Sequence, residues 1–327
     1  MKSKIKVAVL RGGPSSEYEV SLKTGAGVLA NLPEKYEGID VLIDKEGVWH
    51  IEGMPIKPEK LHLRAQVAFL ALHGEYGEDG TIQKFFETHN FPFTGSKSLA
   101  SALGMNKGLS KKIFADHGIP TPNGRVISKR EGADFHKTAL ELFKTFTQPS
   151  VIKPVDRGSS VGVSICHTLP EIEAGLQKAF SVSKAALVEE CIKGKEATCG
   201  VLEDFRGQDF YALPPVEILP KQHQKFFDYE SKYSDTEGAK EICPGNFTRK
   251  ETELIEKYAI AVHKALGARH YSRTDFMVHP KRGIFALEIN TLPGLTPTSL
   301  IPKEMDAVGS SYGELLDHLI TLALERK

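Results

Sequence analysis

Two short segments near the end of the chain carry polar residues in a spacing that suits metal binding. Arg273 and Asp275 are two residues apart, and Glu288 and Asn290 repeat that spacing from thirteen residues after Asp275. Because alternate side chains of a strand point to the same face, each pair would share one face of its strand. Residues 279–283 between them indicate a hairpin loop. Pairing of the strands would gather two carboxylates and an amide oxygen, an oxygen set suited to Mg²⁺ that holds nucleotide phosphates.

The alternative is a surface hairpin whose charges are solvated. Leu287 and Ile289 flank Glu288 and are strongly apolar, which favours a buried strand. A buried carboxylate needs a partner or a metal ion. We therefore predict that Asp275, Glu288 and Asn290 are metal ligands.

A second segment combines one lysine with small residues. Lys153 stands at the predicted end of a strand and is followed by Gly158-Ser159-Ser160-Val161-Gly162. A lysine supplies a point charge, and a loop of glycine and serine leaves backbone N–H groups open to phosphate oxygens. A tight structural turn would explain the segment equally well, so the pattern alone leaves both interpretations open.

The same segment matches the G-x-S-x-G pattern of hydrolases, with Ser160 in the place of the nucleophile. That arrangement needs a helix immediately after the serine, whereas residues 161–166 alternate and are rich in β-branched residues, as in a strand. The hydrolase interpretation is therefore disfavoured. The P-loop pattern is absent, as is G-x-G-x-x-G after the first predicted strand, so neither a P-loop nucleotide hydrolase nor a Rossmann dehydrogenase is supported.

Other acidic residues could contact a substrate or the adenosine part of a nucleotide. Glu17 follows two glycines and could bind a substrate ammonium, or it could be a first-turn carboxylate that the helix dipole favours. Residues 188–190 and 194–196 fit a hinge that offers backbone groups to adenine and a carboxylate to ribose hydroxyls. Solvated surface charges would give the same pattern, so these alternatives stay open on residue types alone.

The elements that must position these residues follow from hydrophobic patterning. Three largely apolar runs indicate strands, at residues 5–10, 39–43 and 67–72. With a helix over residues 21–32, this order predicts a small parallel-sheet domain. A helical segment over residues 99–117, ended by Gly118 and Pro120, then marks the start of a new domain.

Farther along the chain, short β-like segments alternate with helical ones, which predicts mixed sheets with helices packed on them. The expected strands are residues 150–153, 161–166, 186–190, 197–202, 210–213 and 284–290. A helix is expected over residues 251–266. Residues 229–245 are rich in turn-forming and polar residues and predict one long loop, and loops of such length are usually functional lids or disordered.

Composition excludes several classes of protein. The chain has 327 residues, enough for two or three domains. Its 42 basic and 42 acidic side chains leave no charged field for nucleic acid or an anionic membrane. Residues 67–72, the longest apolar run, are far shorter than a membrane span, and residues 5–10 are too short for a signal peptide. The four cysteines lack C-x-x-C spacing, and free thiols fit a reducing cytoplasm.

Eight segments, taken together and in order, closely resemble the D-alanine:D-alanine ligases of the ATP-grasp superfamily. The resemblance extends from about Lys6 to the last predicted helix. The segments are residues 12–21, 71–74 with 77–80, 93–96, 158–162, 229–233, 272–276, 288–294 and 299–302. Any one of them would be a weak signal, whereas all of them in the family's order are specific.

The resemblance implies an α/β fold with mixed sheets, in which an N-terminal Rossmann-like parallel-sheet domain precedes a two-lobed ATP-grasp fold. The expected parts are residues 1–97 for a substrate-binding domain, 98–185 for the smaller ATP-grasp lobe, and 186–327 for the C-terminal lobe with the magnesium and catalytic residues. It also implies a cytoplasmic homodimer that uses ATP with two Mg²⁺ ions, or Mn²⁺, to make D-alanyl-D-alanine for peptidoglycan precursors.

The resemblance further assigns residues to the nucleotide and its metal ions. The residues implied on phosphates are Lys107, Lys153 and Lys232, those implied on adenosine are Glu189 and Glu196, and those implied on Mg²⁺ are Asp275, Glu288 and Asn290. The metal set and Lys153 agree with the chemistry already inferred from residue types.

At the substrate site the resemblance implies a hydrogen-bonded group. Its members would be Glu17, Ser159 and Tyr233, with Glu17 on the ammonium of the first D-alanine. The other substrate-binding and catalytic residues that it implies are His73, Ser299, Leu300, Arg273 and Gly294. Among these, the Ser299-Leu300 pair would receive the carboxylate of the second D-alanine. The Arg273 side chain and the backbone N–H of Gly294 would meet the tetrahedral oxyanion.

Departures from the family's pattern are small. Phe93 replaces the more usual Tyr, and Asn106 stands where Asp is common, but neither is assigned chemistry. Relatives that make D-alanyl-D-lactate depart from the Tyr pattern around Tyr233, so its presence favours an amine as the second substrate.

Two alternatives remain. One is another ATP-grasp ligase that joins a different acid or amine into a dipeptide or depsipeptide. The other is a nucleotide-binding protein that has lost catalysis, which is disfavoured because competent residues hold every predicted phosphate, metal and oxyanion position.

Overall fold

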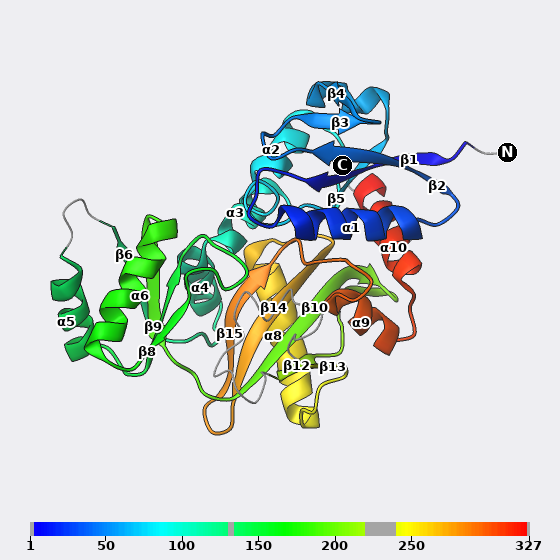
Figure 1. Cartoon of the computed structure of the whole chain (residues 1–327). Coiled ribbons are helices and arrows are strands. Elements are labelled where there is room, and N and C mark those ends of the chain that lie inside the picture. Colours follow the sequence, from blue (N-terminus) through cyan, green and yellow to red (C-terminus); the bar gives the residue numbers. More distant parts are fainter. Residues whose placement is uncertain (1–2, 130–133, 220–239, 326–327) are drawn as a thin grey trace.

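The computed structural model describes residues 3–129, 134–219 and 240–325. Within these residues the strands form sheets of five, six and four strands, with helices packed on them (Figure 1). The five-stranded sheet lies at the top of Figure 1, the four-stranded sheet at the left and the six-stranded sheet below and to the right. The predicted mixed α/β architecture is confirmed.

The five-stranded sheet is formed by the amino-terminal part of the chain. In order across the sheet, its strands are β4 (Met54–Ile56), β3 (Trp49–Ile51), β2 (Tyr36–Ile43), β1 (Ile5–Gly12) and β5 (Val67–Leu70). The pairs β1–β2 and β1–β5 are parallel, as predicted, whereas β3 and β4 add an antiparallel edge. The strand expected over residues 67–72 ends at Leu70, although the backbone N–H of Ala71 still donates to Leu10 of β1 at 3.0 Å.

Helices from both ends of the chain cover this sheet. They are α1 (Tyr18–Asn31), η1 (Pro58–Leu63), α2 (Thr81–Thr88) and, from the carboxyl end, α10 (Tyr312–Glu325). Leu315, Leu316 and Leu319 of α10 are completely buried in one core with Val7 and Val9 of β1. The last helix therefore packs with the amino-terminal part. The predicted division into consecutive domains places this helix in the C-terminal lobe.

The single helix predicted over residues 99–117 is wrong. The structure has α3 (Ser98–Met105) and α4 (Lys107–Asp116), separated at Asn106, whose backbone is extended (φ −88°, ψ 98°). The Asn106 side chain accepts a hydrogen bond from the backbone N–H of Leu109 and so caps α4. This break makes Lys107 the first residue of a helix.

The four-stranded sheet has the order β6 (Gly124–Ser128), β9 (Ala185–Glu190), β7 (Ser150–Pro154) and β8 (Ser164–Cys166). Helices α5 (Phe135–Thr145) and α6 (Leu169–Val182) pack their apolar residues against it. The strand predicted over residues 161–166 starts only at Ser164. Ser159, Ser160 and Gly162 have positive φ values of 48°, 59° and 75°, which strands do not adopt.

The six-stranded sheet carries the predicted hairpin. Its strands are β13 (Lys240–Ile242), β12 (Val216–Leu219), β10 (Lys195–Phe205), β14 (Tyr271–His279) and β15 (Gly283–Asn290), with β11 (Gln208–Ala212) pairing off β10. Helix α8 (Arg249–Leu266) packs on it, and α9 (Leu300–Ala307) lies beside β10 in Figure 1. The loop predicted over residues 229–245 is partly wrong, because β13 pairs with β12; residues 229–239 lie outside the described residues.

The proposed division into residues 1–97, 98–185 and 186–327 needs one adjustment. β9 pairs with both β6 and β7, so its strand belongs to the four-stranded sheet. A boundary after residue 185 would separate this strand from its hydrogen-bonding partners. We therefore propose that the smaller lobe continues through Glu190.

Candidate active site

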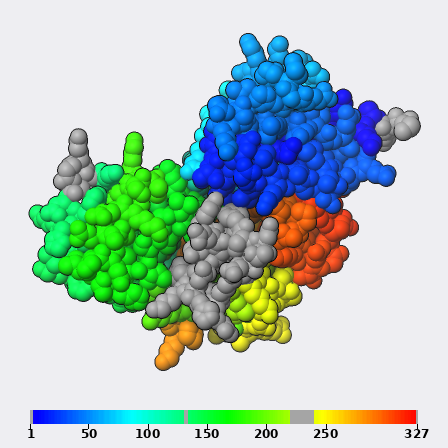
Figure 2. All heavy atoms as spheres, viewed as in Figure 1, coloured from blue at the N-terminus to red at the C-terminus, as the bar shows by residue number. Residues whose placement is uncertain are grey.

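A cleft of about 980 Å³ is lined by strands of the four-stranded and six-stranded sheets and by α1 and loops of the amino-terminal part. Every predicted site residue that the structure describes lines this cleft, from Glu17 in the amino-terminal part to Leu300 at the start of α9. Lys232 and Tyr233 lie outside the described residues. Figure 2 shows the amino-terminal part in blue and the four-stranded part in green side by side on the surface. Tertiary folding therefore gathers residues that lie up to 283 positions apart in the sequence.

The metal-binding prediction depends on the pairing of β14 with β15. In this antiparallel pair Asp275 lies opposite Glu288, and Arg273 lies opposite Asn290. A bulge follows Asp275, a feature that re-aims side chains next to many active sites. The Thr198 hydroxyl donates to Asp275 at 2.6 Å and orients its carboxylate. The hairpin prediction is confirmed, and its two carboxylates and one amide suit Mg²⁺ by donor type.

Arg273 is the cation of this hairpin that lines the cleft. Its Nε donates to Asp275 Oδ1 at 3.1 Å. Burial disfavours the charge of Arg273, but the attraction of Asp275 more than offsets that effect and raises the pKa of the guanidinium above its usual value. Arg273 is therefore a permanent positive charge that lines the cleft, as stabilisation of an oxyanion requires.

The two described lysines predicted on phosphates each pair with a carboxylate. The Nζ atom of Lys107 lies 3.1 Å from Glu288 Oε2 and donates to the backbone oxygen of Arg157 at 2.6 Å. The Nζ atom of Lys153 lies 2.5 Å from Glu189 Oε1. A phosphate oxygen that binds either lysine would have to share that lysine with its carboxylate or displace the carboxylate.

Lys111 is a charged residue that the sequence interpretation missed. It lies one helical turn after Lys107 on α4, and its Nζ atom is 2.6 Å from Glu189 Oε2. Burial lowers the pKa of Lys111 to about 8, although the charge of Glu189 opposes that shift. The spacing from Lys107 was the only signal of this residue, and it could not show that Lys111 pairs with Glu189.

The glycine-rich loop approaches Glu17 closely. A Cβ atom added at Gly158 would lie 3.2 Å from Glu17 Oε1, so the loop backbone passes directly beside this carboxylate. After Ser160 the chain turns and enters β8, with no helix before Leu169 in this described stretch. The strand-to-helix turn of a hydrolase nucleophile is thus missing around Ser160.

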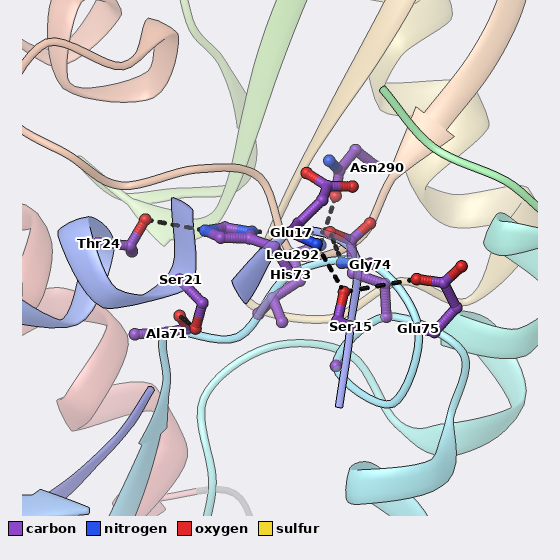
Figure 3. A network of polar contacts seen from close by, with 12 residues as sticks. Ser15, Glu17, Ser21, Thr24, Ala71, His73, Gly74, Glu75, Asn290 and Leu292 are labelled. Carbon is purple, nitrogen blue, oxygen red and sulfur yellow. Dashed lines mark hydrogen bonds and ion pairs between the residues drawn. The ribbon is translucent and has the colours of Figure 1, made fainter. Parts of the chain in front are cut away.

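A chain of polar contacts holds the loop that carries Glu17 (Figure 3). The backbone N–H of Glu17 donates to Ser15 Oγ at 3.1 Å, and Ser15 Oγ donates to Glu75 Oε2 at 3.4 Å. On its other oxygen, Glu75 pairs with Arg157 Nε at 3.4 Å. Glu75 therefore joins the Glu17 loop to the glycine-rich loop, a role that its place in the sequence did not indicate.

Three of the remaining predicted substrate residues, His73, Gly294 and Ser299, lie together. His73 Nε2 shares a hydrogen bond of 2.8 Å with Thr24 Oγ1 (Figure 3). A Cβ at Gly294 would lie 3.3 Å from Ser299 Oγ and 4.0 Å from the His73 ring. Ser299 is the N-cap residue of α9, and the positive end of a helix attracts carboxylates. The group is therefore suited to an anionic substrate end.

Comparison with known proteins agrees with this geometry. A family model described as D-ala D-ala ligase C-terminus matches residues 113–321, and one described as D-ala D-ala ligase N-terminus matches residues 6–60 and 52–96. The chain belongs to the D-ala D-ala ligase family. Its relatives include a protein of Desulfotalea psychrophila named D-alanine--D-alanine ligase, which is 39% identical over 99% of this chain and 96% of that protein.

Solved structures of the ligase family share the whole fold. D-alanine--D-Alanine Ligase from Bacillus anthracis, complexed with ATP, has a TM-score of 0.78 at 33% identity and covers 98% of both chains. VanG D-Ala:D-Ser Ligase from Enterococcus faecalis has a TM-score of 0.83 at 30% identity, with 98% of this chain and 99% of that one covered. Among the described helices of this family member, none is long and apolar enough to cross a bilayer.

Proposed function

We propose that the chain is an ATP-dependent D-alanine:D-alanine ligase, which converts ATP and two D-alanine molecules into D-alanyl-D-alanine, ADP and phosphate. The observation that carries the proposal is one cleft that combines an oxygen-rich hairpin, two lysines, an arginine and the Glu17 carboxylate. The name of the Desulfotalea relative and the ATP complex of the Bacillus relative support it. The dipeptide would serve as a peptidoglycan precursor.

The first chemical step must activate a carboxylate. A carboxylate is a poor electrophile because its leaving group would be oxide, so its oxygen first attacks the γ-phosphorus of ATP and releases ADP. Lys107 and Lys153 would balance the phosphate charge, together with Lys232, through charge-assisted hydrogen bonds. Glu189 and Glu196 also line the cleft. They would contact the adenosine part of ATP.

Metal ions would act at the β14–β15 hairpin. Asp275, Glu288 and Asn290 are the residues that would hold two Mg²⁺ ions, or Mn²⁺, and their register places two carboxylates opposite each other. Bound there, the metal would neutralise phosphate charge as a Lewis acid. The ion pair between Lys107 and Glu288 supports this arrangement because it brings the carboxylate beside a lysine that would bind phosphate.

The first D-alanine would lie beside the glycine-rich loop. Glu17 would bind its ammonium, and Ser159 and Tyr233 would complete the hydrogen-bonded group. The closeness of Gly158 to Glu17 Oε1 supports this placement because it brings the backbone of the glycine-rich loop beside the same carboxylate. The substrate carboxylate would then extend toward the phosphates.

The second D-alanine would lie at the start of α9. Ser299 and Leu300 would receive its carboxylate, near His73, and its amine would attack the acyl carbon so that phosphate leaves. The tetrahedral oxyanion would meet Arg273 and the backbone N–H of Gly294. The raised pKa of Arg273 supports this role because the guanidinium keeps its charge.

The fold gives the least information about the second substrate, whose amine accepts the D-alanyl group. A relative named as a D-Ala:D-Ser ligase shares the fold at 30% identity, so a second substrate other than D-alanine is the competing candidate. We further propose a homodimer in the cytoplasm, where ATP is available and where the four free thiols would stay reduced.

The test is ADP release by the purified protein with ATP and Mg²⁺, with the product identified by mass. D-alanine, L-alanine, D-alanine with D-lactate and D-alanine with D-serine would be compared. We expect D-alanyl-D-alanine from D-alanine alone. Turnover with a different amino acid and none with D-alanine would keep the ligase mechanism and overturn the substrate assignment.

A further inference from the structure

Two lysines share one carboxylate at the wall of the cleft. The Nζ atoms of Lys153 and Lys111 lie 2.5 Å and 2.6 Å from the two oxygens of Glu189. The exposed fractions of these three side chains are only 9%, 7% and 3%. Lys153 and Glu189 line the cleft, whereas Lys111 is not among its lining residues.

This group has one positive charge more than its single carboxylate can neutralise. An uncompensated buried charge is costly, so the group favours an additional anion. Lys153 is the cation of this group that lines the cleft, and the anion would therefore arrive at Lys153. Lys107 differs, because it pairs one-to-one with Glu288.

We propose that Lys111 is a positioning residue: it holds the Glu189 carboxylate so that the Lys153 ammonium remains available to the phosphates of ATP. The inference rests on the proposed function, because it presumes that ATP binds in this cleft. Lys111 itself would not touch the nucleotide. Its effect would pass entirely through Glu189.

The consequence of removing Lys111 follows from the charges. With Lys111 neutral, Glu189 and Lys153 would form a balanced one-to-one ion pair at 2.5 Å in a buried setting. A phosphate would then compete with a carboxylate that has no second cation. We expect the nucleotide dissociation constant to rise by about 10- to 100-fold, whereas the affinity for D-alanine should change by less than about twofold.

The pH dependence gives a readout that loss of packing would not reproduce. Burial lowers the pKa of Lys111 to about 8, and the charged groups around it are Glu189, Lys153 and Glu288. The pKa of Lys153 is raised and that of Glu189 is lowered, so both stay charged as Lys111 loses its proton. Nucleotide affinity should therefore fall as pH rises through about 8.

The experiment compares Lys111→Met, Lys111→Arg and the control Lys112→Met, which changes an exposed lysine of the same helix. ATP and ADP binding would be measured by calorimetry at pH 7 and pH 9, with thermal unfolding of each free protein. We expect weak, pH-independent binding for Lys111→Met and wild-type binding for Lys112→Met. Lys111→Arg should keep its affinity at pH 9, because arginine stays charged.

Three results would overturn the proposal. They are wild-type nucleotide affinity in a folded Lys111→Met protein, an equal loss of D-alanine affinity in that protein, and a loss of affinity in Lys111→Arg at pH 9 as large as in the wild type. The arginine variant decides the matter if Lys111→Met does not fold. Absence of ATP binding by the wild type would instead overturn the proposed function.

Discussion

Glu304 lies on α9 beneath β10 and is completely buried. Its Oε1 atom accepts a hydrogen bond of 2.9 Å from the backbone N–H of Gly200, and its Oε2 atom has no hydrogen-bond partner among the described residues. Burial raises its pKa from 4.5 to about 8, against the opposing effects of the Gly200 N–H and Arg273. The folded protein therefore keeps this carboxyl group protonated at neutral pH.

The effect on stability has a definite sign. Between pH 4.5 and about 8 the unfolded chain loses this proton while the folded chain keeps it, so the free energy of unfolding falls as pH rises. At about 1.4 kcal/mol for each pH unit, the fall is at most about 3.5 kcal/mol at pH 7 and about 5 kcal/mol above pH 8. Glu304→Gln removes the titration and keeps an oxygen for Gly200.

Urea unfolding at pH 5, 6, 7 and 8 would measure this effect. We expect the free energy of unfolding of Glu304→Gln to exceed that of the wild type by a margin that grows with pH. Glu46→Gln, in an exposed turn, is the control and should show a constant difference. A margin for Glu304→Gln that stays the same from pH 5 to pH 8 would refute the reasoning, because it would mean that Glu304 titrates alike in both states.

Three other sets of substitutions test the site and the contacts that support it. Glu288→Gln should lower ADP release by about two orders of magnitude, with partial recovery at high Mg²⁺. Glu75→Arg and Arg157→Glu should each raise the KM for D-alanine by about two- to fivefold, because the ion pair is only partly exposed. The double variant should restore the KM, because it forms the pair again with the charges exchanged. Gly200→Ala should lower the free energy of unfolding by about 1 to 3 kcal/mol, because its Cβ would lie 2.5 Å from Ile301 Cδ1.

Each of these three predictions would be contradicted by a specific result. Normal turnover of Glu288→Gln at low Mg²⁺ would mean that the metal set is wrong. Additive losses in the Glu75 and Arg157 double variant would mean that the two side chains act independently. An unchanged melting temperature in Gly200→Ala would mean that α9 can move away from β10 without loss.

Local pattern was sufficient for the elements whose periodicity is strong. The alternation in residues 273–276 and 287–290 predicted two paired strands, and β14 and β15 have that register. The helix expected over residues 251–266 exists as α8 (Arg249–Leu266). In both cases one face of the element is apolar, so burial of that face and the local backbone preference favour the same structure.

Weaker signals failed where side chains or backbone angles compete with the pattern. The helical pattern of residues 99–117 is broken because the Asn106 side chain caps a new helix. The β-branched residues Val161 and Val163 favour a strand, but positive φ values at Ser160 and Gly162 prevent one. The Asn106 cap is a local contact that competes with the helical period. Gly162, by contrast, packs close to Val182, where an added Cβ would lie 3.3 Å from Cγ2, and no local window contains that contact.

The residue types and their order along the chain were enough to indicate the class of chemistry, because carboxylates, lysines and glycines have intrinsic preferences for metal ions and phosphates. Which charges face one another was decided only by packing. Lys111 beside Glu189, Glu75 beside Arg157 and Glu304 beneath Gly200 each join segments that are far apart in the chain. The energy of a charge depends on its burial and its partners, and both exist only in the folded protein.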